Sequence, residues 1–192
     1  LIHMVEPYNK VRLNFGQKTL IILMVLKKSL TTERICAHLQ LKANGQRNLK
    51  QNKTNKKFVY LISPNKITDI NFYNDLALVL SSKKISFFQL RLKKETNLNK
   101  LIIGKKIKKI CNKYKVKFLI NDDPLLAKKL NADGCHLGQK DMDLIKARKI
   151  LKNKIIGVTC HNSIKLAKRA INDGADYLAF GAFYASKTKI VK

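Results

Sequence analysis

The sequence predicts an α/β fold of the TIM or (β/α)8 barrel family, with about six of the eight β-α units present in this chain. After residue 57, short β-branched and aromatic runs alternate with longer Lys-rich segments of helical period, which is typical of a parallel sheet covered by helices. An Ala-Asp pair precedes two of these runs, at 132–133 and at 175–176, and this internal echo favours a barrel over a doubly wound sheet. Periodicity alone leaves a flavodoxin-like sheet open as the alternative.

Six apolar runs are expected to be the strands, and they cover residues 58–63, 85–91, 116–121, 134–137, 155–159 and 177–180. Five helices are expected between them, over residues 68–82, 98–114, 124–131, 142–152 and 163–173. A closed barrel of this type needs eight strands, whereas an open piece of six leaves two edge strands uncovered. We therefore expect the sequence to be a fragment of a longer product.

The first 57 residues differ from the rest in composition. They carry twelve Lys and Arg against two Glu, a formal charge of +10, and residues 45–57 are polar without a pattern. Residues 19–41 are predicted to form at most one helix, and a basic helix that lies on a membrane surface is left open there. The predicted organisation is thus a basic N-terminal extension over 1–57 and a partial barrel over 58–192.

The net charge of the chain indicates which classes of ligand it attracts. Forty Lys and Arg against twelve Asp and Glu give a formal net charge of +28, which attracts nucleic acid, anionic membranes or phosphorylated substrates. Only six of the forty are Arg, and the Lys residues are mixed with many Ile and Asn, as in proteins of AT-rich genomes. Basic motifs interleaved with aromatic residues, as RNA-binding domains use, are absent. Phosphorylated small molecules, and not nucleic acid, are therefore the expected partners.

The length of the apolar runs and the spacing of the cysteines indicate in which cellular compartment the protein is expected. The longest apolar run, residues 20–26, is much shorter than the ~20 residues that cross a bilayer, so no membrane span is predicted. The four cysteines show no Cys-x-x-Cys spacing, and no signal peptide is readable at the start. A reducing, cytoplasmic location is expected. A homo-oligomer is left open.

Polar side chains follow the second expected strand. Alternation places Gln89, Arg91 and Lys93 on one side of the chain. Two cations and an amide suit a diphosphate joined to a heterocycle, because guanidinium groups bind phosphate oxygens in bidentate fashion. The competing interpretation is a solvated Lys-rich edge.

Acidic residues gather in the middle of the barrel segment. Five of the twelve fall within 22 residues, at positions 122, 123, 133, 141 and 143. Asp122 and Asp141 come just after neighbouring strands, where carboxylates from two loops can hold Mg²⁺. The alternative role is helix capping, with Asp122 or Asp123 before Pro124 and Asp141 before the helix near residue 142.

Two further groups of residues lie near strand ends. The pairs Cys135-His136 and Cys160-His161 offer a weak zinc hypothesis, because neighbours on a strand point to opposite faces and each pair supplies one ligand. A buried Cys beside a hydrogen-bonding His is the expected arrangement. Near the end, the hydroxyls of Ser186 and Thr188 precede a lysine, which together can hold an anion after a strand.

Taken in order, these segments resemble the thiamine-phosphate synthase family over about residues 58–189. The motifs are Gln89-x-Arg91-x-Lys93, Asn121-Asp122, Asp133-Gly134-x-His136-Leu137-Gly138-Gln139-x-Asp141, Gly157-Val158-Thr159-x-His161, Gly174-Ala175-Asp176-Tyr177 and Ser186-x-Thr188-Lys189. The resemblance implies a barrel enzyme that joins hydroxymethylpyrimidine diphosphate to thiazole phosphate. The implied products are thiamine monophosphate and pyrophosphate.

The resemblance also implies roles for individual residues. Those implied to hold the pyrimidine diphosphate are Gln89, Arg91, Lys93, Asn121 and Thr159. Those implied to ligate Mg²⁺ are Asp122 and Asp141, and those implied to contact the thiazole phosphate are Ser186, Thr188 and Lys189. The family usually has Ser at the position of Thr159, Pro-Thr at Ala185-Ser186 and commonly Gly-Pro at Gly181-Ala182. A hydroxyl survives at residues 159 and 186, so these differences affect loop shape more than chemistry.

The implied reaction is dissociative, so no side-chain nucleophile is needed, and no Ser-His-Asp or Cys-His dyad is visible. Two alternatives remain. One is a thiazole tautomerase-like relative without synthase activity, against which the complete set of diphosphate and metal residues argues. The other is an inactive fragment with a basic extension that binds nucleic acid or membrane.

Overall fold

The computed structural model describes residues 20–24 and 58–181, in which seven strands form one sheet in the order β1-β2-β3-β4-β5-β6-β7. The strands are β1 (Leu20–Met24), β2 (Phe58–Ile62), β3 (Ile85–Leu90), β4 (Lys117–Asn121), β5 (Gly134–Leu137), β6 (Ile155–His161) and β7 (Tyr177–Phe180). The helices are α2 (Phe72–Ser81), α3 (Asn97–Lys113), α4 (Pro124–Lys129), α5 (Leu144–Leu151) and α6 (Ile164–Asn172). Every strand and helix predicted after residue 57 is confirmed, with boundaries that differ by at most four residues.

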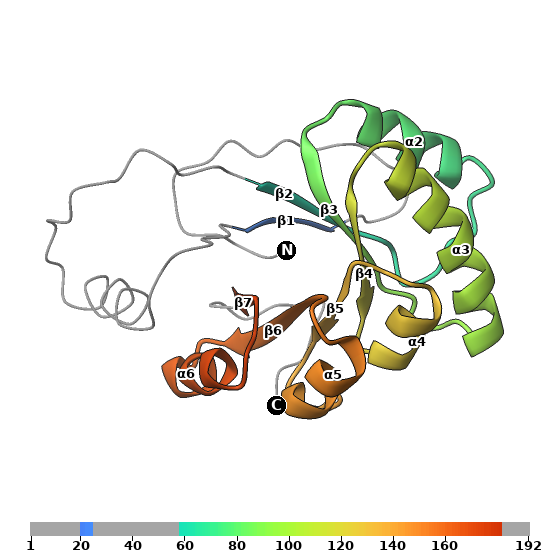
Figure 1. Ribbon diagram of the computed structural model, residues 1–192. Helices are drawn as coiled ribbons and strands as arrows, with labels where there is room; N and C mark the ends of the chain where they lie inside the picture. The colour runs from blue at the N-terminus through green and yellow to red at the C-terminus, as the bar shows by residue number, and fades with distance from the viewer. Residues whose placement is uncertain (1–19, 25–57, 182–192) are drawn as a thin grey trace, which may run out of the picture.

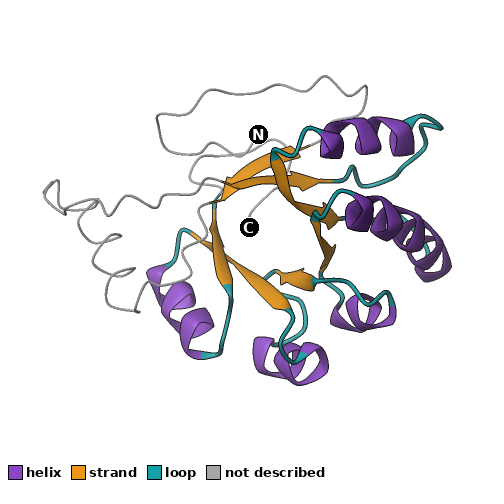
Figure 2. Cartoon of the chain, turned by 45° about the horizontal axis from the view of Figure 1, so that its top comes forward, coloured by secondary structure: helices purple, strands orange, loops and turns teal. Residues whose placement is uncertain are grey.

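The sheet is a partial barrel. Strands β2 to β7 pair in parallel, each with the next in the chain, and one helix follows each of the strands β2 to β6. They curl around a common interior while the helices stay outside, as Figure 2 shows from one end and Figure 1 from the side. A flavodoxin-like sheet requires the strand order to reverse, so the sequential order excludes that alternative and confirms the predicted barrel class.

The first strand corrects one prediction. The helix expected over 19–41 is wrong at Leu20–Met24, which forms β1 and pairs antiparallel with β2. The physical reason is tertiary, because the edge of β2 offers unpaired backbone groups and a short apolar run can satisfy them by pairing. The rest of 19–41 lies outside the described residues, as do Ser186, Thr188 and Lys189. The division of the chain at residue 57 stays a prediction.

Strand alternation creates two apolar layers. Outward side chains such as Phe88, Phe118 and Ile156 are buried between the sheet and the helices. The inward cluster holds Tyr60, Ile62, Phe87, Leu119 and Tyr177. The inner face therefore changes from apolar to polar along the strands, and its polar part lies toward their carboxyl ends.

The repeated Ala-Asp pair at residues 132–133 and 175–176 has a structural role at the amino ends of the strands. Asp133 accepts hydrogen bonds from the Phe118 backbone N–H at 3.0 Å and from Lys117 Nζ at 2.9 Å. Asp176 accepts from the Ile156 N–H at 2.8 Å and from Arg148 at 2.7 Å. Each acid thus joins its own strand to the preceding strand. Within the described part of the chain, no helix is long and apolar enough to cross a membrane.

Candidate functional site

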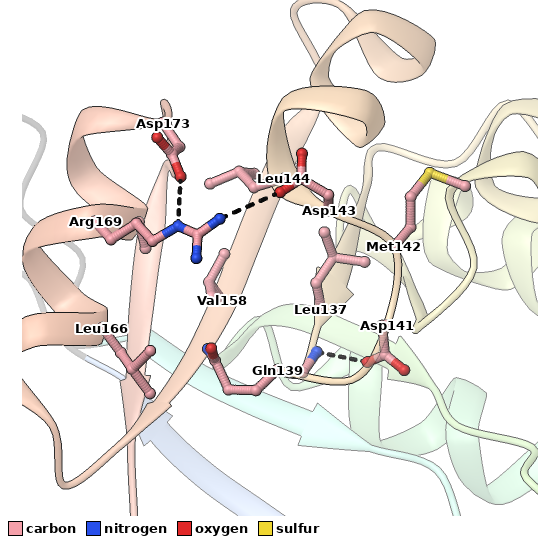
Figure 3. Close-up of a pocket in the computed structure, with 12 residues that line it drawn as sticks. Leu137, Gln139, Asp141, Met142, Asp143, Leu144, Val158, Leu166, Arg169 and Asp173 are labelled. Carbon is pink, nitrogen blue, oxygen red and sulfur yellow. Dashed lines mark hydrogen bonds and ion pairs between the residues drawn. The ribbon is translucent and has the colours of Figure 1, made fainter.

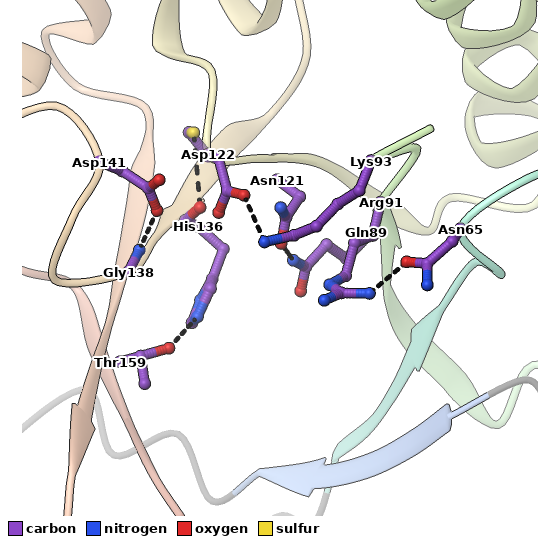
Figure 4. Close-up of polar contacts among 11 residues, drawn as sticks. Asn65, Gln89, Arg91, Lys93, Asn121, Asp122, His136, Gly138, Asp141 and Thr159 are labelled. Atoms are coloured by element: carbon purple, nitrogen blue, oxygen red, sulfur yellow. Dashed lines mark hydrogen bonds and ion pairs between the residues drawn. The ribbon is translucent and has the colours of Figure 1, made fainter. Parts of the chain in front are cut away.

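The polar residues of the inner face lie at the carboxyl ends of β3, β4, β5 and β6. Gln89, Asn121, His136 and Thr159 each occupy an inward position near the end of a different strand. Because neighbouring parallel strands end at the same rim, these four side chains meet although they are far apart in sequence (Figure 4). The structure therefore brings together three of the site residues predicted from the sequence, Gln89, Asn121 and Thr159, with His136 beside them.

The segment after β3 reaches the same rim. Gln89 is buried and its amide nitrogen donates to Asn121 Oδ1. Arg91 donates through its guanidinium to Asn65 Oδ1 and through its backbone N–H to Ser63 Oγ at 2.8 Å. Of the two cations, Arg91 is thus held by the segment after β2.

Lys93 takes a different partner. Its ammonium lies 3.2 Å from Asp122 Oδ2, so it reaches from the β3 segment to the end of β4 (Figure 4). Its side chain is about half exposed, which leaves the ammonium open to a ligand. Three elements, the ends of β2, β3 and β4, therefore place two cations at one rim.

The structure distinguishes capping acids from site acids. Asp123 accepts from the Leu126 N–H at 2.9 Å and begins α4, and Asp143 accepts from the Ile145 N–H at 3.0 Å and begins α5. Asp122 and Asp141 cap neither helix. The capping alternative therefore applies to their neighbours in sequence.

Asp122 and Asp141 lie next to each other (Figure 4). Asp122 adopts a left-handed backbone with φ of 63°, and Asp141 accepts from the Gly138 N–H at 2.6 Å. Burial raises the pKa of Asp141, and hydrogen bonding and charge repulsion from Asp122 raise it further, while Gly138 and Lys93 lower it. A carboxylate whose charge is disfavoured by a neighbouring carboxylate forms, with that neighbour, a site suited to a cation.

Beneath this rim, a chain of hydrogen bonds crosses the interior. Tyr60 Oη donates to Gln89 Oε1 at 2.9 Å and lies 2.8 Å from Tyr177 Oη. Tyr177 Oη lies 2.9 Å from His136 Nδ1, and His136 Nε2 lies 2.8 Å from Thr159 Oγ1. With the contact between Gln89 and Asn121, the chain links one end of the site to the other.

Sequence reasoning missed Tyr60 and Tyr177 as site residues, and noted His136 in a Cys-His pair and in a family motif without giving it a role in the site. The signal available in the sequence was a residue with a polar atom at an inward position of its strand. A glycine supports the arrangement, because a Cβ added to Gly157 would lie 1.9 Å from Cζ of Tyr177. Gly157 therefore leaves room for the Tyr177 ring.

The cysteines belong to the other face of the sheet. Cys135 and Cys160 are buried in the outer apolar layer, whereas His136 points inward, as alternation predicts. Burial raises the pKa of Cys135 and raises that of Cys160 to about 11, so these thiols stay protonated. Among the described residues, no three His, Cys, Asp or Glu gather into a metal-binding group, and the Asp122–Asp141 pair is the acidic feature of the rim.

A small cavity of about 100 Å³ lies behind the β5–α5 loop (Figure 3). Its apolar floor includes Leu137 and Val158. Arg169 lies at its edge, 3.6 Å from Asp143 and 3.4 Å from Asp173. The cavity shares Asp141 with the site rim, so it is the outer side of the same loop.

Fold and rim together define a (β/α) barrel protein whose polar site lies at the carboxyl ends of its strands, with carboxylates and cations side by side. The family profile described as thiamine monophosphate synthase matches residues 59–192. The chain belongs to the thiamine monophosphate synthase family, which confirms the resemblance found in its motifs.

Individual proteins similar to this chain carry the names of the same family. The chain is 94% identical over 144 residues to the thiamine-phosphate synthase of Pelagibacter ubique (strain HTCC1062), covering 75% of this chain and 70% of the relative. It is 48% identical over 102 residues to that of Marinobacter nauticus, covering 53% of this chain and 46% of the relative. A solved thiamine phosphate pyrophosphorylase from Pyrococcus furiosus is similar with a TM-score of 0.57 and 28% identity, over 64% of this chain and 59% of that one. The matched part thus spans between about half and about seven tenths of each relative.

Proposed function

We propose that the protein is a transferase that joins hydroxymethylpyrimidine diphosphate to thiazole phosphate, giving thiamine monophosphate and pyrophosphate. The observation that carries the proposal is the rim where Asp122 and Asp141 lie together with Lys93 beside them. Such a rim suits a metal-bound diphosphate. The names of the relatives support the same reaction, and favour it over a thiazole tautomerase-like activity.

The proposed metal is Mg²⁺, held by Asp122 and Asp141. The donor set fits, because both groups supply hard carboxylate oxygens and Asp122 raises the free energy of the charged form of Asp141. Mg²⁺ bound there would supply positive charge to the oxygens of the diphosphate. The two side chains come from separate loops, so their spacing depends on the pairing of β4 with β5.

The cations have a complementary task. Arg91 is oriented by Asn65 and Lys93 by Asp122, and both groups can bind diphosphate oxygens from the side of β3. Their charge is set in place before the diphosphate accumulates charge as it leaves, so little reorganisation accompanies bond breaking.

The heterocycle is proposed to lie over the interior chain of hydrogen bonds. Gln89, Asn121 and Thr159 provide amide and hydroxyl groups at the depth of the inward strand positions. The bond between the pyrimidine methylene carbon and the diphosphate oxygen breaks, and the leaving group keeps the electron pair. The thiazole nitrogen then captures the resulting cation. Ser186, Thr188 and Lys189 are proposed to hold the thiazole phosphate, as the resemblance implies.

The proposed partners are therefore two phosphorylated small molecules, and the proposed location is the cytoplasm. The three cysteines in the described residues, Cys111, Cys135 and Cys160, are unpaired and buried, which agrees with a reducing compartment. Association into a homo-oligomer stays a prediction.

The test is product formation from purified protein. The protein is mixed with both substrates and Mg²⁺, and thiamine monophosphate and pyrophosphate are measured in parallel. We expect equal amounts of both products, and none when either substrate is omitted or EDTA is added. Binding of thiazole phosphate without affinity for the pyrimidine diphosphate would contradict the proposal and favour the tautomerase-like alternative.

A further inference from the structure

Six side chains form the interior chain of hydrogen bonds. Once the donor and the acceptor are known at one end, the donor and the acceptor of each following hydrogen bond are fixed. The order is Asn121, Gln89, Tyr60, Tyr177, His136 and Thr159. Each tyrosine and the threonine has a single hydroxyl proton, and a neutral imidazole has one N–H. A proton used in one contact is therefore unavailable for the next contact along the chain.

The carboxamide of Gln89 sets the direction. Its nitrogen donates to Asn121 Oδ1, so its oxygen is left to accept, and Tyr60 donates to it at 2.9 Å. The Tyr60 proton is then committed. The contact of 2.8 Å between the two phenols must therefore use the proton of Tyr177.

The direction continues to the histidine. Because the Tyr177 proton points at Tyr60, the Tyr177 oxygen accepts from His136, whose Nδ1 lies 2.9 Å away. A neutral imidazole that carries its proton on Nδ1 has an accepting Nε2. Thr159 then donates its hydroxyl proton to Nε2 across 2.8 Å. Burial raises the pKa of both tyrosines, so both phenols keep the protons that the chain needs.

The two ends of the chain face the proposed ligand with opposite polarity. The Thr159 hydroxyl has its proton turned inward, so its lone pairs remain as an acceptor. The Asn121 oxygen accepts from Gln89, so its amide N–H groups remain as donors. Both residues are partly exposed, whereas Tyr60, Tyr177 and His136 are buried.

We propose that His136, Tyr177 and Tyr60 are positioning residues that orient the Thr159 hydroxyl as a hydrogen-bond acceptor, and thereby favour a heterocycle that offers it an amino group over one that offers it a carbonyl oxygen. An aminopyrimidine can meet this requirement, since its amino group donates a hydrogen bond. The corresponding oxopyrimidine has the reverse pattern, with a carbonyl acceptor beside a ring N–H. The choice of heterocycle rests on the proposed function, whereas the tautomer of His136 does not.

The first readout needs no substrate. The imidazole nitrogens of the protein are observed by ¹⁵N NMR at neutral pH, and His136 is assigned by comparison with His136→Gln. We expect the neutral Nδ1–H tautomer, with a protonated Nδ1 and an unprotonated Nε2. Tyr177→Phe keeps the ring beside Gly157 and removes only the accepting oxygen, so it should shift His136 toward the Nε2–H form. The matched control Tyr114→Phe, at the end of α3, should leave the spectrum of His136 unchanged.

The second readout is discrimination between substrates. The ratio of kcat/KM for the aminopyrimidine diphosphate to that for its oxo analogue should be about 10²-fold or more in the wild-type protein, because a carbonyl oxygen in place of the amino group would face the lone pairs of Thr159 without a proton between them. Tyr177→Phe should lower this ratio about tenfold, and Tyr114→Phe should not change it.

The possible outcomes distinguish a failure of the proposed function from a failure of the directional hydrogen-bond chain. Failure of the wild-type protein to convert the amino substrate would overturn the proposed function, while the NMR result would still decide the tautomer. An Nε2–H or doubly protonated His136 in the wild-type protein would overturn the directional chain. So would a Tyr177→Phe variant that keeps both the tautomer and the substrate ratio of the wild-type protein.

Discussion

The two ends of the barrel strands use the same residue, aspartate, for opposite purposes. At the amino ends, Asp133 and Asp176 each accept a backbone N–H of the neighbouring strand and pair with a cation. At the carboxyl ends, Asp122 and Asp141 lie against each other, and burial and repulsion raise the pKa of Asp141. An acid whose partners are all within the protein stabilises the fold. A pair whose charges are only partly balanced is prepared for a ligand.

The largest effect is expected from Asp122→Asn. Asparagine tolerates the left-handed backbone at this position and removes one proposed metal oxygen and its charge. We expect kcat/KM for thiamine monophosphate formation to fall by about 10²-fold or more, with little change in the free energy of unfolding. Steady-state kinetics with both substrates measures the first quantity, and urea unfolding measures the second.

The matched control is Asp143→Asn, two residues after Asp141. Asparagine caps a helix as well as aspartate does, so α5 should begin as before and activity should be kept. Equal losses in Asp122→Asn and Asp143→Asn would erase the distinction between site acids and capping acids.

At the amino ends, Asp133→Ala should reduce stability and leave chemistry intact. The change leaves the Phe118 N–H without its side-chain acceptor and removes the partner of Lys117, at a cost of about 1–3 kcal/mol. Urea denaturation should show a lower midpoint, and kcat/KM of the folded protein should match the wild type. Asp133→Asn retains an acceptor and should lose less. A stable Asp133→Ala with impaired turnover would reverse the roles assigned to the two rims.

The pH dependence of the stability of Asp141→Asn tests whether burial and the neighbouring Asp122 destabilise the charged form of Asp141. A pKa raised in the folded state means that the Asp141 contribution to stability is present below the unfolded pKa and is lost as the pH rises through the folded pKa. Without Mg²⁺ at neutral pH, Asp141→Asn should therefore be more stable than the wild type, by less than about 1 kcal/mol given solvent screening.

The same difference should vanish below about pH 3, where the wild-type carboxyl is protonated in both the folded and the unfolded state. Urea unfolding in EDTA at both pH values measures it. A variant that is less stable than the wild type at neutral pH would show that Asp141 is satisfied by Gly138 and Lys93 alone.

The smallest effect is expected from Arg169→Gln, beside the cavity. Its guanidinium is largely exposed and its ion pairs to Asp143 and Asp173 are 3.6 and 3.4 Å long, so the loss should stay below about 0.5 kcal/mol. Arg148→Gln is the matched comparison, because Arg148 donates to three backbone carbonyls and to Asp176. Thermal unfolding should place Arg148→Gln well below Arg169→Gln. The reverse order would mean that the cavity side of the loop contributes more to stability than the amino-end rim.

The fold after residue 57 was predictable because its pattern is local. Each strand is a short apolar run, and the side on which Gln89, Arg91 and Lys93 lie follows from alternation within one segment. The strand β1 was not predictable in this way. Its five residues carry no alternation, and their state depends on the free edge of β2, which is about 40 residues away in sequence.

The residues of the candidate site can be divided in the same way, into those that a local pattern identifies and those that only the fold brings together. Residue type and spacing along the chain made Asp122 and Asp141 candidates for a metal site, with helix capping as the alternative, because both follow strands in a barrel that gathers strand ends. Which acids cap helices and which face each other depended on three-dimensional packing, because Asp122 and Asp123 differ by one residue and yet point to different partners. The links through Tyr60, Tyr177 and His136 arise in the same way, since hydrogen-bond partners up to 117 residues apart in sequence meet only when the sheet curls.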